Sequence, residues 1–354
     1  MRSTVKVLII DDSELIRSLL TEILSQDPNI DVVGSAIDPF DAREKIKELK
    51  PDVLTLDIEM PRMDGITFLK NIMRLKPMPV VMISTLTEKG ADVTLQALQL
   101  GAIDYISKPK LDVRSTLPAL AADIVNKVKH AARANISAVE HNIKQEQLSK
   151  PHAPLPSKDL NKRIDVICIG ASTGGTEAIK EVLMTLPEKM PPILIAQHMP
   201  GGFTQSFAKR LNSLCKLNVK EFSSEREPLV ANTIYVANGD YHMTLLKRSG
   251  DYYLIRDDSD PVNRHKPSVD VLFNSVVNNA ESRAIGVILT GMGMDGAQGL
   301  KNMLDAGAYT LAQDEASSVV WGMPRVAVEK NAARETLPLR KIGEKLINLS
   351  YKSK

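Results

Sequence analysis

Short apolar runs alternate with helix-like segments over the first 128 residues. The apolar runs are KVLII, IDVVGSA, DVLTL, PVVMIS and DYIS. Alternation of this kind predicts βα units on a parallel sheet. The segment from Ser13 is typical of the helices between the strands, because a Ser N-cap precedes apolar residues at helical spacing that should face the sheet: Leu15, Ile16, Leu19, Leu20, Ile23 and Leu24.

Strand-like runs return from Ile164 onward. They are DVICIG, PILIAQ, TIYVA, AIGVILT and YTLAQ, again separated by helical segments such as residues 268–278. The run MTLLKRSGDYYLIR instead has the pattern of a β-hairpin that turns at Ser249 and Gly250. The second half is therefore predicted to be a doubly wound, mostly parallel α/β domain with a β-hairpin insertion.

A segment of different character separates the two patterns. Residues 127–163 hold eight Lys or Arg against three Asp or Glu, together with Pro151, Pro154 and Pro156, which is typical of a solvated linker. A length of 354 residues is enough for two domains, or three. We predict a first domain over residues 1–125, a linker over 126–163 and a second domain over 164–354, with the linker helical in part as far as about residue 147.

Composition excludes several classes of protein. Apolar residues make up 43% of the chain and charged residues 25%, as in globular proteins, and a net charge of +2 lacks the basic excess of a nucleic-acid-binding surface. Two cysteines cannot form a disulfide scaffold, and the N-terminus does not resemble a signal peptide, so we expect a cytoplasmic protein. Prolines and glycines interrupt the longest uncharged stretch, residues 190–208, so we expect no membrane insertion.

Acidic residues follow two strands of the first domain. Asp11 and Asp12 come directly after the first strand, and Asp57 ends the third. The carboxyl ends of parallel strands meet at one edge of a sheet, so these three carboxylates can converge. Such a cluster repels itself unless a hard cation neutralises it, and the sequence therefore predicts a Mg²⁺ site that could support phosphoryl transfer.

Two further polar residues should reach the same edge. Ser84 ends the fourth strand and Lys108 follows the fifth, so a hydroxyl and an ammonium group could bind phosphoryl oxygens. The alternative is that strand-end aspartates such as these only cap helices and form turns.

These residues carry a resemblance to a known family. The motifs DDS at 11–13, LDIEMPRMDG at 56–65, MIST at 82–85 and KP at 108–109 resemble a response-regulator receiver domain. The resemblance implies a flavodoxin-like, five-stranded doubly wound sheet, phosphorylation of Asp57 by a histidine kinase, and Mg²⁺ held by Asp11, Asp12 and Asp57. It also implies that Ser84 and Lys108 sense the phosphoryl group and that Tyr105 is the family's aromatic switch residue.

A glycine-rich turn opens the second domain. The strand DVICI runs into GASTGG, a G-x-S-x-G pattern that exposes the hydroxyl of Ser172 at the start of a helix. A helix N-terminus can stabilise an oxyanion, which favours a nucleophilic serine. The same turn could equally cradle a phosphate, with Ser172 as a capping residue.

A base and a carboxylate for Ser172 are found at other strand ends. Of the histidines outside the linker, His198 follows the strand PILIAQ, whereas His242 and His265 lie near the predicted hairpin. Asp295 follows the strand AIGVILT, where it could orient His198, cap the helix that follows, or do both. The order Ser, His, Asp along the chain disfavours the α/β-hydrolase fold.

The loop around Asp295 has a second interpretation. Gly291, Gly293 and Gly296 match the G-x-G-x-x-G of dinucleotide-binding proteins. An ordinary dinucleotide fold carries this loop at its first βα turn, whereas here it comes late in the domain. A dinucleotide-binding enzyme is therefore an alternative function, as is a DNA-binding response regulator, although the second domain lacks the pattern of a basic helix-turn-helix.

Long motifs of the second domain carry another resemblance. GASTGG, AQHMPGGFTQSFAKRL, NRHKPSVDVLF, ILTGMGMDGAQGL and AQDEASSVVWGMP closely resemble the catalytic domain of chemotaxis protein-glutamate methylesterases. The resemblance implies that Ser172, His198 and Asp295 form a catalytic triad that demethylates receptor glutamate esters and deamidates receptor glutamines. Backbone amides of Thr173 and Met292 are candidates for the oxyanion hole, and no cofactor is expected for hydrolysis.

The two resemblances together imply regulation by phosphorylation. We expect the unphosphorylated first domain to inhibit the second, and phosphorylation of Asp57 to relieve that inhibition. The expected partners are methyl-accepting chemoreceptors as substrates and a chemotaxis histidine kinase as phosphodonor, and we expect the protein to be a monomer that binds no nucleic acid.

Overall fold

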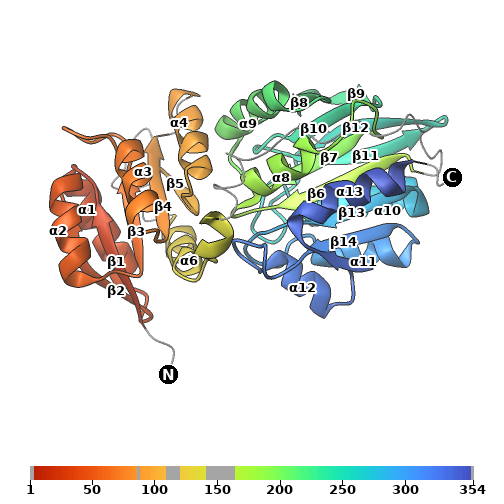
Figure 1. The fold of residues 1–354 in the computed structure, drawn as a ribbon. Helices are drawn as coiled ribbons and strands as arrows, with labels where there is room; N and C mark the ends of the chain where they lie inside the picture. Colours follow the sequence, from red (N-terminus) through yellow and green to blue (C-terminus); the bar gives the residue numbers. More distant parts are fainter. Residues whose placement is uncertain (1–3, 86–87, 109–119, 141–163, 352–354) are drawn as a thin grey trace. The chain divides into compact units, whose positions relative to one another are not determined.

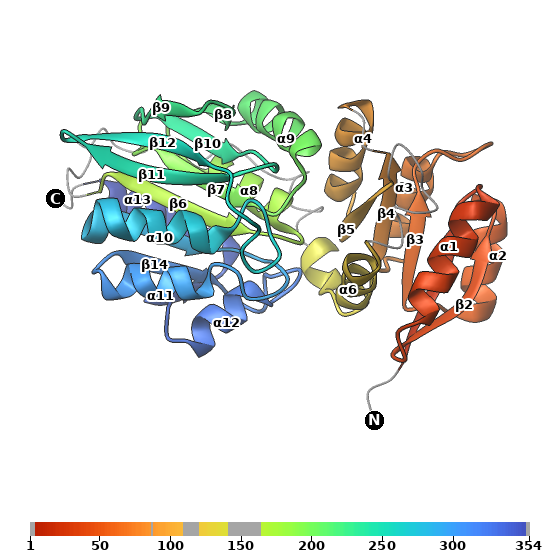
Figure 2. The ribbon, with the colours of Figure 1, turned by 180° about the vertical axis from the view of Figure 1, so that it is seen from behind.

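A computed structural model describes residues 4–85, 88–108, 120–140 and 164–351. The chain forms two compact units, residues 1–149 and 150–354, each with its own sheet (Figure 1; Figure 2 from behind).

The first unit contains a five-stranded parallel sheet. Its strands run in the spatial order β2-β1-β3-β4-β5, which confirms the predicted flavodoxin-like topology and brings all five carboxyl ends to one edge. The strands are β1 (Val5–Ile10), β2 (Ile30–Ala36), β3 (Val53–Asp57), β4 (Val80–Thr85) and β5 (Asp104–Lys108).

Helices cover this sheet on both faces. Ser13 caps the first of them by accepting a hydrogen bond from the Ile16 amide, as predicted, but Leu15 is 40% exposed and lies outside the buried stripe. Helix α6 (Ala121–Ala131) runs across the predicted domain boundary at residue 125, packs on the first helix and is held there by an ion pair from Lys129 Nζ to Asp27 Oδ2 at 2.7 Å. The helices are α1 (Glu14–Ser25), α2 (Pro39–Leu49), α3 (Gly65–Leu75), α4 (Glu88–Gln99) and α6 (Ala121–Ala131). Residues 141–163 of the predicted linker lie outside the described residues.

The second unit contains a seven-stranded sheet in which every neighbouring pair is parallel. The order is β15-β14-β13-β6-β7-β10-β8, and β6, β7, β10 and β13 are buried throughout, which explains why they read as continuous apolar runs. The strands are β6 (Val166–Ala171), β7 (Ile193–Gln197), β8 (Asn218–Phe222), β10 (Thr233–Ala237), β13 (Ala284–Ile288), β14 (Tyr309–Gln313) and β15 (Glu335–Leu337).

The first strand of this unit, β6, lies in the middle of the sheet. Chain order therefore reverses beside it, with β7 on one side and β13 on the other. In open α/β sheets, ligands bind at the strand ends beside such a reversal. The fold thus points to the carboxyl ends of β6, β7 and β13.

The predicted hairpin is present and forms a separate sheet with one more strand. β11 (His242–Arg248) pairs antiparallel with β12 (Asp251–Asp257), and β9 (Arg226–Pro228) joins the edge of β12. The turn residues Ser249 and Gly250 have φ values of 53° and 95°, the pattern of a type I′ turn.

Helices flank the seven-stranded sheet, and one of them also supports the hairpin. In α10, Leu272 and Phe273 enter the core, while Ser275 Oγ accepts a hydrogen bond from the Leu245 amide of β11 at 2.9 Å. The helices are α8 (Gly175–Met184), α9 (Gly201–Leu214), α10 (Val269–Ala280), η1 (Glu281–Arg283), α11 (Ala297–Asp305), α12 (Met323–Glu329) and α13 (Leu339–Ser350). Within the described part of the chain, no helix is both long and apolar enough to cross a bilayer.

The packing of α10 gives a stability prediction with a matched control. Leu272 is 1% exposed and Leu214 is 42% exposed. Leu272→Ala should lower the free energy of unfolding of the second unit by about 2–5 kcal/mol because it leaves a cavity, whereas Leu214→Ala should change it by less than about 0.5 kcal/mol. Urea titration followed by the fluorescence of Trp321, the single tryptophan of the chain, measures both. Equal losses in the two variants would contradict the assigned core.

Candidate functional site

Ser172 lies in a tight turn between β6 and α8. Its backbone amide donates to Thr290 O at 3.1 Å, and its carbonyl accepts hydrogen bonds from the Gly175 amide at 2.7 Å and from Gln197 Nε2 at 3.0 Å. Gly174 has φ 75°, and a Cβ added there would lie 2.8 Å from Val319 Cβ, so this position requires glycine. The strand-turn-helix arrangement predicted for GASTGG is therefore present.

His198 follows β7, the strand beside β6. Its amide donates to Ala171 O at 3.1 Å, which holds it beside the Ser172 turn. Its Nε2 lies 2.8 Å from Asp295 Oδ2, and its Nδ1 is buried without a hydrogen-bond partner. Ser172 and His198 are both among the described residues, and no hydrogen bond joins their side chains; such bonds commonly tighten only when substrate binds.

Asp295 is buried at the amino end of α10. Its Oδ2 accepts from the Val269 amide at 2.6 Å, and its Oδ1 accepts from Ser268 Oγ and Asn263 Nδ2, each at 2.8 Å. Ser268 is the N-cap of α10, so the carboxylate lies where backbone amides and the helix dipole favour negative charge. These donors fix the position of the carboxylate.

The charge on Asp295 determines which nitrogen of His198 carries a proton. Burial raises the pKa of Asp295, but hydrogen bonding and attraction to His198, with donation from Asn263 and the Val269 amide, outweigh it, so that pKa lies well below its usual range. An ionised carboxylate can only accept, so Nε2 carries the proton and Nδ1 is left as a base. The prediction that Asp295 caps the helix that follows it is wrong, because α11 starts after Gly296 and has no side-chain cap.

The glycine loop 291–296 lies against the Ser172 turn. A Cβ added at Gly291 would lie 2.8 Å from Ser172 Cβ, and Thr173 O accepts from Thr290 Oγ1 at 3.0 Å. Among the described residues, none accepts a hydrogen bond from the Met292 amide. An amide N–H is thus available near the nucleophile, as the predicted oxyanion role of Met292 requires.

The same loop does not favour a dinucleotide site. A Cβ at Gly296 would lie 2.4 Å from Val269 Cγ1, so this glycine permits close packing against α10. The carboxylate of Asp295, within the same loop, is hydrogen-bonded to His198. Dinucleotide-binding proteins carry a ribose-binding acidic residue about 20 residues beyond the glycine loop. Asp314 lies at about that distance, but its carboxylate accepts hydrogen bonds from the Ser317 amide and hydroxyl. The dinucleotide alternative is therefore disfavoured.

Three residues near this site were not singled out from the sequence. Asn263 and Ser268 bind Asp295, and Gln197 holds the Ser172 turn. Asn263 and Ser268 lie in a loop without periodicity about thirty residues from Asp295. The only sequence signal was that both fall within the long motif NRHKPSVDVLF, which assigns no role to either.

The acidic residues of the first unit converge as predicted. One oxygen from each of Asp11, Asp12 and Asp57 lies within 4.8 Å of the others. Lys108 Nζ lies 2.8 Å from both Asp11 Oδ2 and Asp57 Oδ1. Three carboxylates against one ammonium group leave excess negative charge, and this hard oxygen donor set fits Mg²⁺.

Burial shifts the protonation of this cluster. Desolvation raises the pKa of Asp57 to about 6, against the attraction of Lys108 and with the repulsion of Asp11 added. Desolvation likewise raises the pKa of Asp11. Burial alone would lower the pKa of Lys108, but the two carboxylates outweigh it and raise that pKa.

The remaining predicted residues of the first unit lie on the neighbouring strands. Ser84 Oγ accepts a hydrogen bond from Thr94 Oγ1 at 2.6 Å, which ties the end of β4 to α4. Tyr105 on β5 is 5% exposed, with Lys127 Nζ 5.3 Å from its ring centroid.

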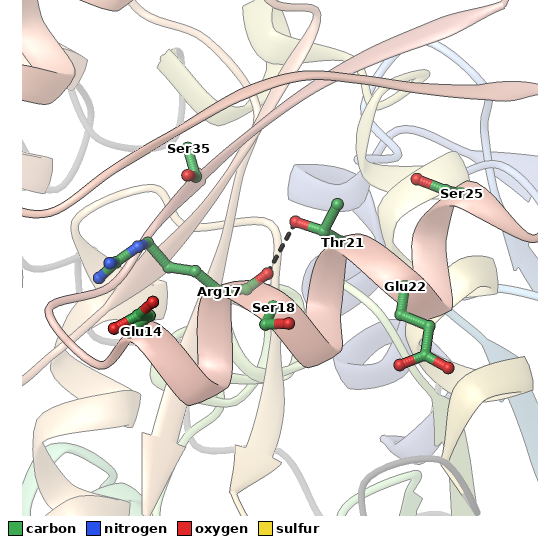
Figure 3. A pocket seen from close by; sticks show the side chains of 7 residues that line it. All are labelled: Glu14, Arg17, Ser18, Thr21, Glu22, Ser25 and Ser35. Atoms are coloured by element: carbon green, nitrogen blue, oxygen red, sulfur yellow. Dashed lines mark hydrogen bonds between the residues drawn. The ribbon is translucent and has the colours of Figure 1, made fainter.

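A surface hollow along α1 belongs to neither site. Figure 3 shows its polar lining, in which Thr21 Oγ1 donates to Arg17 O at 2.7 Å. Arg17 also donates to the carbonyls of Asp11 and Asp12, at 2.8 and 2.9 Å, and so supports the backbone of the acidic cluster. The hollow is therefore lined in part by Arg17, whose guanidinium supports the acidic cluster.

Comparison with known proteins covers both units. The family model of CheB methylesterase matches residues 167–346, and that of the response regulator receiver domain matches residues 7–116. A protein of Xanthomonas campestris pv. campestris named protein-glutamate methylesterase/protein-glutamine glutaminase 1 is 53% identical over 100% of this chain and 99% of its own length. A Hydrogenovibrio crunogenus protein with the same name, without the number, is 50% identical over 99% of this chain and its full length.

One solved structure is similar to the second unit. The CheB methylesterase catalytic domain of Thermotoga maritima is 38% identical, with a TM-score of 0.51 over 52% of this chain and 98% of that domain. Together with the strand-end positions of Ser172, His198 and Asp295, these matches show that the chain belongs to the CheB methylesterase family and carries a response-regulator receiver domain ahead of its methylesterase domain.

Proposed function

We propose that this protein hydrolyses glutamate γ-methyl esters on chemoreceptors, releasing methanol, and deamidates receptor glutamines, with Ser172 as nucleophile. The observation that carries the proposal is the polarised imidazole of His198, whose Nε2 is bonded to a buried, ionised Asp295 while Nδ1 is left as a base beside the Ser172 strand end. The names of the full-length relatives supply the substrate class.

The proposed reaction proceeds through an acyl-enzyme. Ser172 Oγ attacks the ester carbonyl and its proton passes to His198 Nδ1, while the amides of Thr173 and Met292 hold the oxyanion. The C–O bond to the methoxy group then breaks and the leaving oxygen takes the proton from His198 as methanol. Water attacks the acyl-enzyme with His198 again as base, which frees Ser172 and the glutamate; with a glutamine substrate the leaving group is ammonia.

The receiver domain is proposed to regulate this reaction through Asp57. A histidine kinase would supply the phosphoryl group to Asp57, and Asp11, Asp12 and Asp57 would hold Mg²⁺, which when bound neutralises the carboxylates and phosphoryl oxygens. Lys108, already beside Asp57, would pair with the phosphoryl group. Ser84 would leave Thr94 to bind a phosphoryl oxygen, which would release the end of α4.

A DNA-binding output is disfavoured on the architecture of the second unit. Such an output would require a basic helix-turn-helix module, whereas residues 164–351 fold around a seven-stranded parallel sheet.

The nucleophile is tested by methanol release from methylated receptor membranes. Ser172→Ala should lower the rate by at least about 10³-fold, because the acyl-enzyme cannot form. A small phosphodonor with Mg²⁺ should accelerate the wild type but not Asp57→Asn. A methylesterase of known activity, assayed on the same membranes, is the positive control. Release that does not need Ser172 would contradict the proposed nucleophile.

Inhibition by the receiver domain is tested by removing residues 1–147. The deletion should raise basal methanol release by about 5- to 150-fold, the range of an ordinary coupling free energy, and abolish the response to phosphodonor. The isolated domain of the Thermotoga maritima relative has been solved, which supports the use of this fragment. A fragment that folds but is no faster than the unphosphorylated full chain would rule out inhibition by the receiver.

The pKa of Asp57 gives a pH prediction for Mg²⁺ binding. With its pKa near 6, Asp57 is mostly protonated at about pH 5.5 and ionised at about pH 7.5, so Mg²⁺ must displace a proton only at the lower pH. Calorimetric titration should show about fourfold weaker binding at the lower pH. Asp57→Asn should reduce this difference to the part that Asp11 contributes, because burial raises the pKa of that ligand too, whereas Asp12→Asn should weaken binding but keep the pH difference. Equal wild-type affinities at both pH values would contradict a metal site that includes Asp57.

A further inference from the structure

The ring of His265 lies flat against the ring of His198. Their centroids are 3.7 Å apart and their planes differ by 11°. The hydrogen bond to Asp295 fixes one edge of His198 at Nε2, whereas His265 covers one of its faces. The reaction proposed above uses the Nδ1 edge and assigns His265 no role.

A tight turn holds His265 in this place. Val262 and His265 exchange backbone hydrogen bonds of 3.2 and 2.9 Å, and the two residues between them, Asn263 and Arg264, have φ values of 53° and 69°. Two consecutive left-handed residues cost conformational energy and indicate a turn that its surroundings maintain. Asn263 supplies part of that support, since its amide group donates to both Asp295 and Asp270 at 2.8 Å. One short turn therefore contacts two members of the proposed triad.

We propose that His265 is a positioning residue for His198, an inference that rests on the proposed role of His198 as the base. A single hydrogen bond at Nε2 leaves the imidazole free to rock about that bond, and a parallel ring at contact distance restricts this motion. The ring face of His265 also stabilises the imidazolium that His198 becomes during each proton transfer, since a π face attracts a cation placed over it. Asp295 is a charged group that contacts this pair of rings, through its hydrogen bond to His198. Arg264 and Lys266 flank His265 in the sequence, and Lys266 Nζ donates a hydrogen bond to Asp258 O at 3.1 Å.

Two substitutions in the full-length protein separate the ring face from the polar atoms of His265. His265→Phe keeps a flat π face and loses the nitrogens, whereas His265→Gln keeps polar atoms and loses the face. For His265→Gln we expect about a tenfold fall in kcat for methanol release, with KM changed less than about twofold. The acid limb of its pH profile should move to lower pH, because the imidazolium of His198 loses support. His265→Phe should keep at least about half of the wild-type kcat and an unshifted acid limb.

The outcomes distinguish this proposal from the triad on which it rests. His198→Gln is assayed in parallel, and near-normal release from that variant would overturn the proposed triad itself. With His198 essential, wild-type kcat and an unshifted acid limb in His265→Gln would overturn the role of His265 alone. A His265→Phe variant as impaired as His265→Gln, with an unchanged melting temperature, would show that the polar atoms act rather than the ring face, and would also overturn the proposal.

Discussion

The buried negative charge of Asp295 is the constraint on which the methylesterase domain depends. An unpaired carboxylate at 1% exposure would be very costly, so the surrounding structure has to supply donors. It supplies them from the first turn of α10, from Asn263 in a neighbouring turn and from His198. Compensating the charge therefore also fixes the direction of the imidazole, and the stability of the site and its chemistry share the same contacts.

The receiver domain meets a similar constraint in a different way. Its buried carboxylates, Asp11 and Asp57, share one ammonium group, and their pKa values are raised by burial, whereas that of Asp295 is lowered by its donors. A cluster that is only partly neutralised keeps net negative charge, which favours the binding of a hard cation. A carboxylate with all its donors in place instead serves as a fixed electrostatic partner.

The sequence predicted those features that follow from strand position. The buried strands of both sheets read as apolar runs, and Ser172, His198 and Asp295 were found because each follows one of them. The missed strands are β8, an edge strand in which only Val219 and Phe222 are apolar, and β9 and β15, which have three residues each. Asn263, Ser268 and Gln197 act through contacts that no local period encodes, and Leu15 matched the helical spacing but lies at the exposed margin of its helix.

The parts of the site are spread along the chain in a way that affects its synthesis. Ser172 and His198 are translated well before α10 and Asp295, and β13, which pairs with β6, also comes late. A nascent chain on the ribosome thus carries the serine and the histidine without the carboxylate that polarises them. Completing the proposed triad therefore requires the late strand β13 and the loop that carries Asp295 to dock beside β6, a pairing between distant parts of the chain that is slow to form.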